Sequence, residues 1–313
     1  MMKRLFVAEL GAWSGQGVLS VMGPTGSGKT SALLEYLETN SQLKNTLLVS
    51  VDAVAVYRGL DIGSAKAMGT ERETFEWTGL DFKNPDEPCT VRDFLDAVEN
   101  PISRALASGR PVILVGGSGF YENALVEGLA PGAASDPDFQ KQLEFLSNEV
   151  LFNRMVCFDK KWGEFLHVND RYRLTRYLDL VERQGFNWAD LRETKQRNPQ
   201  LKELWSETTC TIRGLEWPRE VYVERLKRRI DEMWKAGWVR EVETLLKTYP
   251  ETALGLRTIG YREMLDHVRD PQTWPAAKTK ERILLAHLQY VKRQKTWLRG
   301  RPSPDSSTHP KSS

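Results

Sequence analysis

The sequence predicts an α/β fold in which helices flank a parallel sheet built around a phosphate-binding loop, with a small helical subdomain inserted. Short apolar runs alternate with helical or polar stretches, which is typical of parallel strands buried on both faces. A glycine-rich loop directly follows the first of these runs. The segment 130–205 is polar, prone to form helices and free of such runs, which predicts the inserted subdomain.

The apolar runs place the expected strands at 18–22, 46–51, 112–115 and, later in the chain, within 210–217. A helix is expected from residue 30 onward, directly after the glycine-rich loop. Apolar residues at near-helical spacing predict two long amphipathic helices, 219–247 after Pro218 and 278–299. The predicted organisation is a core formed by 1–129 and 206–301, the inserted subdomain 130–205, and a disordered tail 302–313.

The composition indicates a soluble globular protein. The chain has 313 residues, 40% of them hydrophobic, which is enough for a sizeable core. Its cysteines, Cys89, Cys157 and Cys210, are odd in number and far apart, so neither a disulfide framework nor a zinc site is expected. No secretory signal and no membrane-spanning stretch is apparent, and the expected compartment is the cytoplasm.

Basic residues gather near the end of the chain although the net charge is only +2. Seven Lys or Arg stand in 280–301 against the single acid Glu281. A basic stripe of this kind suits a phosphate backbone, and an ordinary solvated helix face has the same pattern.

The glycine-rich loop, GPTGSGKT, fits the phosphate-binding P-loop pattern. Its glycines allow backbone N–H groups to surround a phosphate, its lysine reaches the terminal phosphate, and its threonine offers a hydroxyl to Mg²⁺. The expected diphosphate or nucleotide site therefore consists of Gly23, Pro24, Thr25, Gly26, Ser27, Gly28, Lys29 and Thr30. The pattern indicates phosphate binding without specifying ATP hydrolysis.

A carboxylate, Asp52, ends the second apolar run, in SVDAVAVYRGLDIGSAK. The carboxyl ends of strands in an open α/β sheet form the crevice where ligands bind. Asp52 could there position or deprotonate an acceptor hydroxyl, as in a kinase, or take a proton from another acceptor. A helix cap or an ordinary loop acid is the alternative.

The third apolar run, VILV, ends in Gly-Gly-Ser, where an ATP-hydrolysing P-loop protein would usually have an aspartate. Gly116 and Gly117 permit close backbone approach, and Ser118 supplies a hydroxyl for a substrate or a diphosphate oxygen. A tight turn between strand and helix would also explain the sequence. The missing acid argues against ATP hydrolysis.

An ordered set of motifs extends from Gly23 to Arg299, and with it the chain resembles the bacterial tRNA dimethylallyltransferases, also called tRNA isopentenyltransferases or the IPP transferase family. Besides those quoted above, the motifs are VILVGGSGFYENALVEGL, VNDRYRLTRYLDL, RRIDEMWKAGWVREVETLL, RTIGYREM and YVKRQKTWLRG. The resemblance implies a P-loop NTPase-like core that uses no ATP as its energy source.

By this resemblance the P-loop holds dimethylallyl diphosphate with Mg²⁺, bound through Thr30. The dimethylallyl group passes to N6 of the adenine 3′-adjacent to the anticodon of tRNA, and diphosphate is released. Asp52 would be the base, because adenine N6 is a poor nucleophile. Lys29, Ser118 and Arg219 would complete the catalytic set, with the cations stabilising the leaving diphosphate.

The resemblance also implies contacts with the anticodon stem-loop and a monomeric protein. The expected tRNA-binding residues are Asp52, Ala53, Val54, Ala55, Tyr172, Arg173, Leu174, Thr175, Arg176, Arg257, Tyr261, Arg262, Lys292, Arg293, Gln294, Trp297 and Arg299. Gln294 and Trp297 could hydrogen-bond or stack a loop base, although core packing is the other interpretation of Trp297.

Some positions depart from the family pattern. Ala53 and Ala55 stand where the family commonly has Ser and Gln, and Ala286-His287 replaces Thr-Arg. These changes suggest a divergent member with altered tRNA preference or lower activity. Two alternatives are a tRNA-binding protein that has lost catalysis and a small-molecule P-loop kinase.

Overall fold

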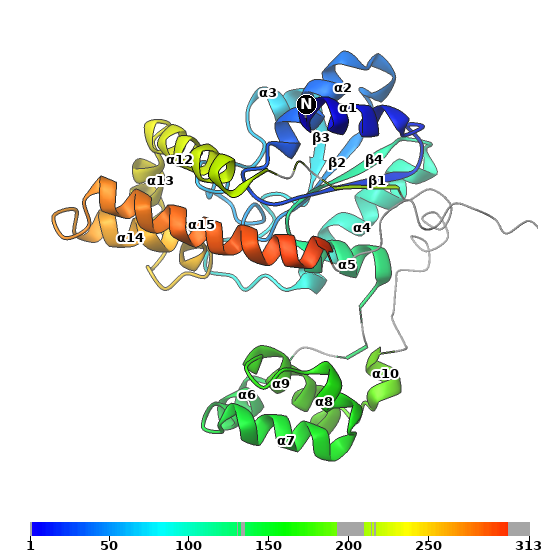
Figure 1. Cartoon of the computed structure of the whole chain (residues 1–313), viewed down its shortest axis with the longest axis vertical. Coiled ribbons are helices and arrows are strands. Elements are labelled where there is room, and N and C mark those ends of the chain that lie inside the picture. The colour runs from blue at the N-terminus through cyan, green and yellow to red at the C-terminus, as the bar shows by residue number, and fades with distance from the viewer. Residues whose placement is uncertain are drawn as a thin grey trace, which may run out of the picture. The chain divides into compact units, whose positions relative to one another are not determined.

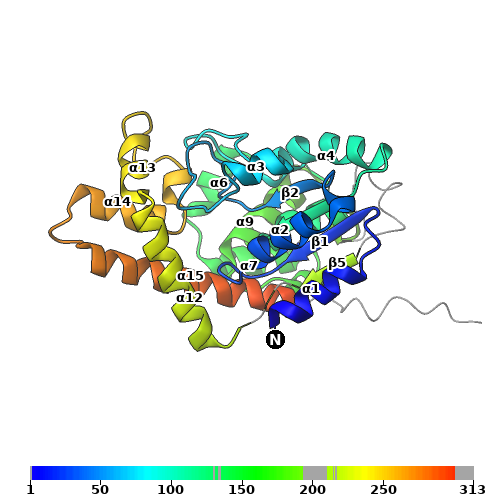
Figure 2. The same ribbon diagram turned by 90° about the horizontal axis from the view of Figure 1, so that it is seen from above.

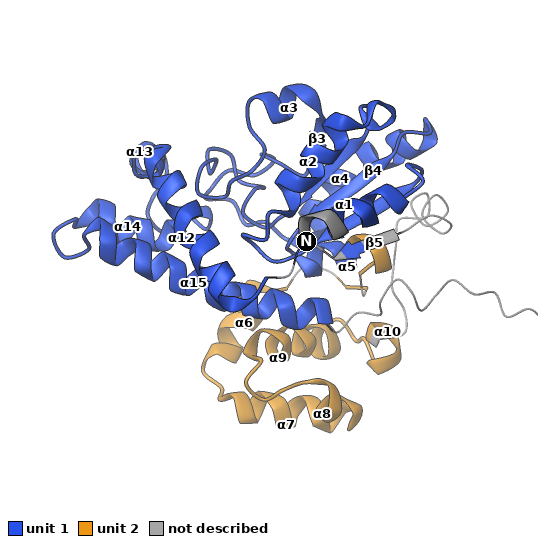
Figure 3. Cartoon of the chain, turned by 45° about the horizontal axis from the view of Figure 1, so that its top comes forward, with its two compact units in different colours: residues 1–124, 199–313 blue, residues 125–198 orange. Residues whose placement is uncertain are grey.

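The computed structural model describes residues 2–129, 131–132, 135–192, 210–213, 215 and 217–299 (Figure 1). The chain divides into two compact units, one formed by 1–124 with 199–313 and the other by 125–198 (Figure 3). The predicted tail 302–313 lies outside the described residues. No helix within the described ranges is long and apolar enough to cross a membrane.

A five-stranded parallel sheet forms the centre of the first unit, in the order β3-β2-β4-β1-β5. Its strands are β1 (Val18–Met22), β2 (Leu47–Val51), β3 (Glu76–Thr78), β4 (Val112–Gly116) and β5 (Cys210–Arg213). Every residue of β1, β2 and β4 is buried, which explains why these strands are continuous apolar runs. The parallel sheet with flanking helices confirms the predicted fold class.

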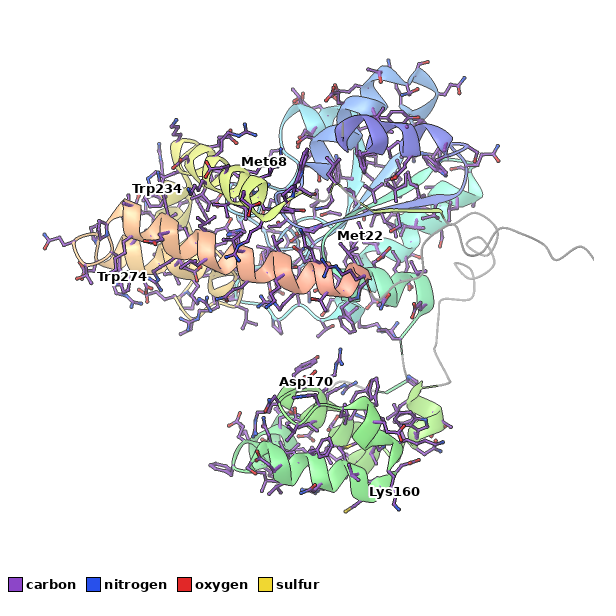
Figure 4. The ribbon with its side chains drawn as sticks, viewed as in Figure 1. Met22, Met68, Lys160, Asp170, Trp234 and Trp274 are labelled. Carbon is purple, nitrogen blue, oxygen red and sulfur yellow. The ribbon has the colours of Figure 1, made fainter. Side chains whose placement is uncertain are left out.

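Strand register brings three chain segments to one edge of the sheet. Met22 of β1 and Val51 of β2 both pair with Gly116 of β4. The P-loop after β1, the turn after β2 and the loop after β4 therefore begin at the same level. Met22 marks this level in Figure 4.

Helices cover both faces of the sheet. On one face are α1 (Met2–Ala12) and α2 (Lys29–Thr39), and on the other is α4 (Val91–Ala107), as Figure 2 shows. Leu10, Leu33 and Leu37 pack with the strand residues Leu19 and Ile113 in the main core. The unit also contains η1 (Ser41–Leu43) and α3 (Thr70–Thr74), and α5 (Gly119–Glu127) follows β4.

The second half of this unit is helical. It comprises α12 (Arg219–Lys235), α13 (Trp238–Leu245), η3 (Gly255–Arg257), α14 (Tyr261–Arg269) and α15 (Ala276–Arg299). The predicted single helix 219–247 is therefore wrong. The helix is interrupted at Gly237, whose φ of 100° is incompatible with a continuing right-handed helix. The helix predicted at 278–299 corresponds to α15, which begins two residues earlier.

The second unit consists of helices alone within its described residues. These are α6 (Pro137–Glu144), α7 (Asn148–Phe158), α8 (Lys161–Phe165), α9 (Arg171–Leu178), the π-helical turn η2 (Asp179–Arg183) and α10 (Trp188–Arg192). Leu151, Met155, Trp162 and Leu178 form a core of its own. The inserted helical subdomain is thus present. Its span, 125–198, differs from the predicted 130–205, and residues 193–209 lie outside the described part.

Candidate active site

The P-loop joins β1 to the first turn of α2, and two of its glycines have positive φ angles. Gly26 (73°) and Gly28 (87°) adopt the backbone region that favours glycine. A side chain at either position would also meet α12, since a Cβ at Gly26 would lie 2.7 Å from Leu226 and one at Gly28 would lie 2.5 Å from Arg225. The loop leads into the N-terminus of α2, where free N–H groups favour an anion.

Side chains of helix α12 and of Trp217, just before it, donate hydrogen bonds to the P-loop backbone. Arg225 donates from Nε to the carbonyl oxygen of Gly26 (2.9 Å) and from Nη2 to that of Ser27 (3.3 Å). The indole N–H of Trp217 donates to the same Ser27 oxygen (2.9 Å), and the Arg225 guanidinium lies over the Trp217 ring. These donors occupy carbonyl groups of the loop and so fix its conformation.

A cluster of charges surrounds the base of the P-loop. Burial lowers the pKa of Lys29 to about 8, against the opposing effect of the Asp52 carboxylate, and the Arg229 guanidinium lowers it further. Burial likewise lowers the pKa of Arg229, while Asp52 acts to raise it. The buried Nε of Arg229 has no hydrogen-bond partner among the described residues. Two cations and one carboxylate thus lie within electrostatic reach of one another.

Asp52 directly follows β2, and a tight turn holds its carboxylate. Oδ1 accepts hydrogen bonds from the backbone N–H groups of Val54 (2.8 Å) and Ala55 (3.2 Å). Oδ2 accepts no hydrogen bond from the residues that the structure describes. One oxygen therefore fixes the orientation of the side chain, and the other can accept a proton.

Ser118 connects the loop after β4 to Asp52. Its Oγ accepts from the backbone N–H of Ala53 (3.1 Å), while its own backbone N–H donates to the carbonyl of Val51 (3.1 Å). Tyr290, on α15, lies close to the Ser118 side chain. Burial raises the pKa of this tyrosine, and the interaction with Ser118 acts to lower it. The loop after β4 thus contributes a buried hydroxyl beside the carboxylate.

The segment 61–63, which follows Asp52 in the same motif, is held by Glu241 of α13. Its carboxylate accepts from the backbone N–H groups of Asp61 (3.0 Å), Ile62 (2.6 Å) and Gly63 (3.3 Å). The Tyr261 hydroxyl donates to the same carboxylate (2.7 Å). The SAK part of the motif is anchored through Lys66, a buried cation paired with Asp61 and Asp81.

The structure brings the P-loop residues, Asp52 and Ser118 to one edge of the sheet, whereas no hydrogen bond or ion pair among the described residues joins Arg219 to any of them. Arg219 is exposed at the first position of α12. It precedes Arg229 by ten residues, or roughly 15 Å of helical rise. Two other arginines of α12 lie at the site, and the sequence interpretation missed both. Arg225 contacts the P-loop, and Arg229 lies near Lys29 and Asp52. The four-residue spacing of these two arginines, flanking buried Leu226 and Ile230, was the available signal.

Three expected tRNA contacts are core residues. Leu174 is fully buried in the core of the helical unit, Tyr261 is fully buried against Trp238 and Glu241, and Ala55 is 2% exposed. None of these side chains is available to RNA, so the three predictions are wrong. Each belongs to a motif that also contains exposed side chains, and the motif alone did not separate buried from exposed positions.

The other expected contacts in the motifs of Leu174 and Tyr261 differ in how exposed they are and in whether they are already paired with another side chain. Tyr172 is 75% exposed, and Arg173, Arg257 and Arg262 are exposed. Arg262 pairs with Glu263. Thr175 and Arg176 are half-buried, and Arg176 donates to Ser135 and pairs with the buried Asp179.

Helix α15 presents two different faces. Lys292, Arg293 and Arg299 are exposed. Gln294 is buried, and its amide contacts the backbone of Thr25 and Gly117. The Trp297 ring packs on Gly119 so closely that no Cβ would fit there, which agrees with the packing interpretation of this tryptophan. His287 is also buried and bonded to Ile283, so the replacement at this position faces the core.

Comparisons with known proteins agree with this arrangement. A model of the IPP transferase family matches residues 55–301. The chain is 32% identical over 287 residues to a tRNA dimethylallyltransferase from Cyanothece sp., covering 90% of this chain and 89% of that protein.

Solved structures give the same picture. The tRNA isopentenylpyrophosphate transferase of Bacillus halodurans has a TM-score of 0.61 and 25% identity, covering 91% of this chain and 88% of that one. A eukaryotic dimethylallyltransferase acting on tRNA has a TM-score of 0.72 over 90% of this chain and 70% of that one, and at 21% identity it supports the fold alone.

Proposed function

The chain belongs to the IPP transferase family, and we propose that it transfers the dimethylallyl group of dimethylallyl diphosphate to N6 of the adenine 3′-adjacent to the anticodon in tRNA. One observation carries the proposal. Asp52, with one carboxylate oxygen unbonded, lies within electrostatic reach of Lys29 of the P-loop and of Arg229. The carboxylate proposed as proton acceptor and the loop proposed to bind diphosphate thus lie at one edge of the sheet.

The P-loop is the proposed donor site. Backbone N–H groups at the start of α2, the Lys29 ammonium and the Arg229 guanidinium would surround the diphosphate. Arg229 supports this assignment because its Nε is buried and unpaired among the described residues, a condition that an anion would relieve. We assign to Arg229 the role expected of Arg219, while Arg225 positions the loop.

Thr30 is the proposed protein ligand of Mg²⁺. Within the described residues no group of three or more His, Cys, Asp or Glu side chains could hold a metal ion. Mg²⁺ commonly keeps several waters and is bound by one or two protein groups together with substrate phosphates, so a single hydroxyl beside a diphosphate site fits it. The ion would neutralise charge on the diphosphate.

In the proposed reaction N6 of adenine attacks the allylic carbon of the donor. The new N–C bond forms while the bond from that carbon to the diphosphate oxygen breaks, and Asp52 takes the proton from N6. Lys29, Arg229 and the P-loop N–H groups stabilise the negative charge that grows on the diphosphate. Preorganised donors of this kind are each worth about 10² to 10³ in rate.

The proposed tRNA contacts are exposed side chains of both units. They are Tyr172, Arg173, Arg257, Arg262, Lys292, Arg293 and Arg299. Aromatic and arginine side chains can stack unpaired loop bases, and cations neutralise the phosphate backbone. Ala53 and Val54, beside Asp52, would contact the target adenine. A monomer in the cytoplasm is proposed as the working form.

The deciding experiment measures transfer of label from dimethylallyl diphosphate to unmodified tRNAs with Mg²⁺, with ATP as a competing donor. We expect label at the adenine next to the anticodon, and a fall of about 10² to 10⁴-fold in Asp52→Asn. Labelling from ATP instead would favour the kinase alternative. Tight tRNA binding without label would indicate a protein that binds tRNA and does not modify it.

A further inference from the structure

Gln294 of α15 joins two loops of the active-site edge. Its Oε1 accepts a hydrogen bond from the backbone N–H of Thr25 in the P-loop (2.9 Å), and its Nε2 donates to the carbonyl of Gly117 after β4 (3.0 Å). Only 6% of the residue is exposed. Both ends of the amide are therefore engaged with backbone groups, which leaves the side chain poorly placed to read an RNA base.

The fit at this bridge is close. A Cβ added at Gly117 would collide with the Gln294 amide and would lie 3.2 Å from the carbonyl oxygen of Gly23. The loop after β4, the P-loop and the helix thus meet with no room for another atom. Small changes in this amide would shift one loop relative to the other, because a packed interior transmits displacement.

The same helix face reaches the catalytic carboxylate. Tyr290 lies one turn before Gln294, a spacing that places both side chains on one face. Tyr290 lies close to Ser118, whose side chain acts on its pKa, and Ser118 in turn accepts a hydrogen bond from the N–H of Ala53, the residue after Asp52. Helix α15 therefore contacts the loop proposed for the donor through Gln294, and the turn that holds Asp52 through Tyr290 and Ser118.

We propose that Gln294 is a positioning residue that fixes the P-loop relative to the segment 117–118 and thereby sets the distance from the donor diphosphate to Asp52. This role rests on the proposed function and replaces the expectation that Gln294 contacts tRNA. Its two hydrogen bonds hold groups that would otherwise lose their partners inside the protein. Reaction geometry is sensitive to displacements of about 1 Å, so loss of the bridge would slow the reaction.

The test replaces Gln294 with methionine, which keeps the length of the side chain and removes both hydrogen bonds. Calorimetry with inorganic diphosphate and Mg²⁺ is expected to show Kd about tenfold higher than in the wild type, equivalent to about 1.4 kcal/mol. The turnover number kcat should fall at least tenfold, while the Kd for tRNA stays within twofold. Gln289→Met, an exposed glutamine of the same helix, serves as the matched control and should change none of these values.

Two results would overturn the role. A higher Kd for tRNA with unchanged diphosphate binding would show that Gln294 contacts RNA, and unchanged values throughout would show that the bridge has no effect on the site. Diphosphate binding is measured without turnover. A wild-type protein that binds diphosphate but transfers no prenyl group would therefore sink the proposed function alone, and one that binds no diphosphate would sink both.

Discussion

Arg225 donates from Nε to the carbonyl oxygen of Gly26 over 2.9 Å, and this bond ties α12 to the P-loop. The arginine is about 200 residues away from the loop in sequence, so the loop depends on the late helical part of the chain for its conformation. A charge-assisted hydrogen bond of this kind is worth about 1.5–3 kcal/mol.

Arg225→Met is therefore expected to weaken diphosphate binding about tenfold and to lower the free energy of unfolding by about 1–3 kcal/mol. Calorimetry with diphosphate and chemical denaturation measure the two effects. Arg228→Met is the control, because Arg228 is exposed on the same helix and its ion pair among the described residues is a surface pair with Glu232. Equal behaviour of the two variants would show that the contact with Gly26 is dispensable.

The pKa of Lys29, about 8, predicts pH-dependent diphosphate binding. The ammonium must be protonated to pair with an anion, so this contribution is complete well below pH 8 and is lost as the pH rises through 8. Binding above that pH should take up a proton, because the bound anion raises the lysine pKa. Calorimetry in buffers of different ionisation enthalpy measures the uptake.

The matched variant is Lys29→Arg, whose charge persists throughout this pH range. Ionisation of diphosphate itself affects both proteins equally, so the difference between them reports Lys29. Identical proton uptake by the wild type and the variant would contradict the assignment of this titration to Lys29.

Gly117→Ala tests the crowded junction between Gln294 and the P-loop. The added Cβ would collide with the Gln294 amide and would lie 3.2 Å from the carbonyl oxygen of Gly23, so the amide must leave its bridging position or one of the loops must move. We expect kcat to fall by at least tenfold, since reacting groups displaced by about 1 Å can lose two orders of magnitude. Gly11→Ala is the control, because its Cβ would meet only the Tyr36 hydroxyl, at 4.0 Å. A fully active Gly117→Ala enzyme would contradict the need for close packing here.

Glu241→Gln tests the clamp on 61–63. The carboxylate accepts hydrogen bonds from three backbone N–H groups and from Tyr261. An amide has one acceptor oxygen and adds a donor that faces other donors, so we expect a loss of about 1.5–3 kcal/mol in the free energy of unfolding. The exposed neighbour Glu243→Gln should have an effect near zero. Comparable stability of both variants in denaturant would show that the clamp contributes little.

The buried strands were predictable because β1, β2 and β4 are covered on both faces and so consist of uninterrupted apolar residues. β3 was missed because it has three residues, with Glu76 exposed, and carries no such signal. The end of α12 was missed because apolar spacing continues across Gly237 into α13. A positive φ angle at one glycine breaks the helix without changing the hydrophobic pattern.

The sequence predicted the meeting of the P-loop and Asp52 at one edge of the sheet, because each belongs to a short motif that directly follows a buried strand. The site was not predictable where function depends on contacts between distant segments. Arg225 and Arg229 resemble ordinary surface cations of an amphipathic helix until α12 is placed against the P-loop. Gln294 resembles an RNA-reading amide until its partners, Thr25 and Gly117, are known.

Lys292 and Arg293 on α15 are expected to supply charge for tRNA binding. Both are exposed, and neither takes part in the bridge made by Gln294. Each phosphate contact contributes about 0.7–0.9 to the slope of log Kd against log salt concentration, so the double variant Lys292→Gln/Arg293→Gln should lower that slope by roughly 1.5.

Lys44→Gln, an exposed lysine remote in sequence, is the control. Filter binding of tRNA between about 50 and 200 mM salt measures the slopes. Because the proposed diphosphate site is the P-loop, the Kd for diphosphate should be the same in all three proteins. An unchanged slope in the double variant would place the RNA on another face.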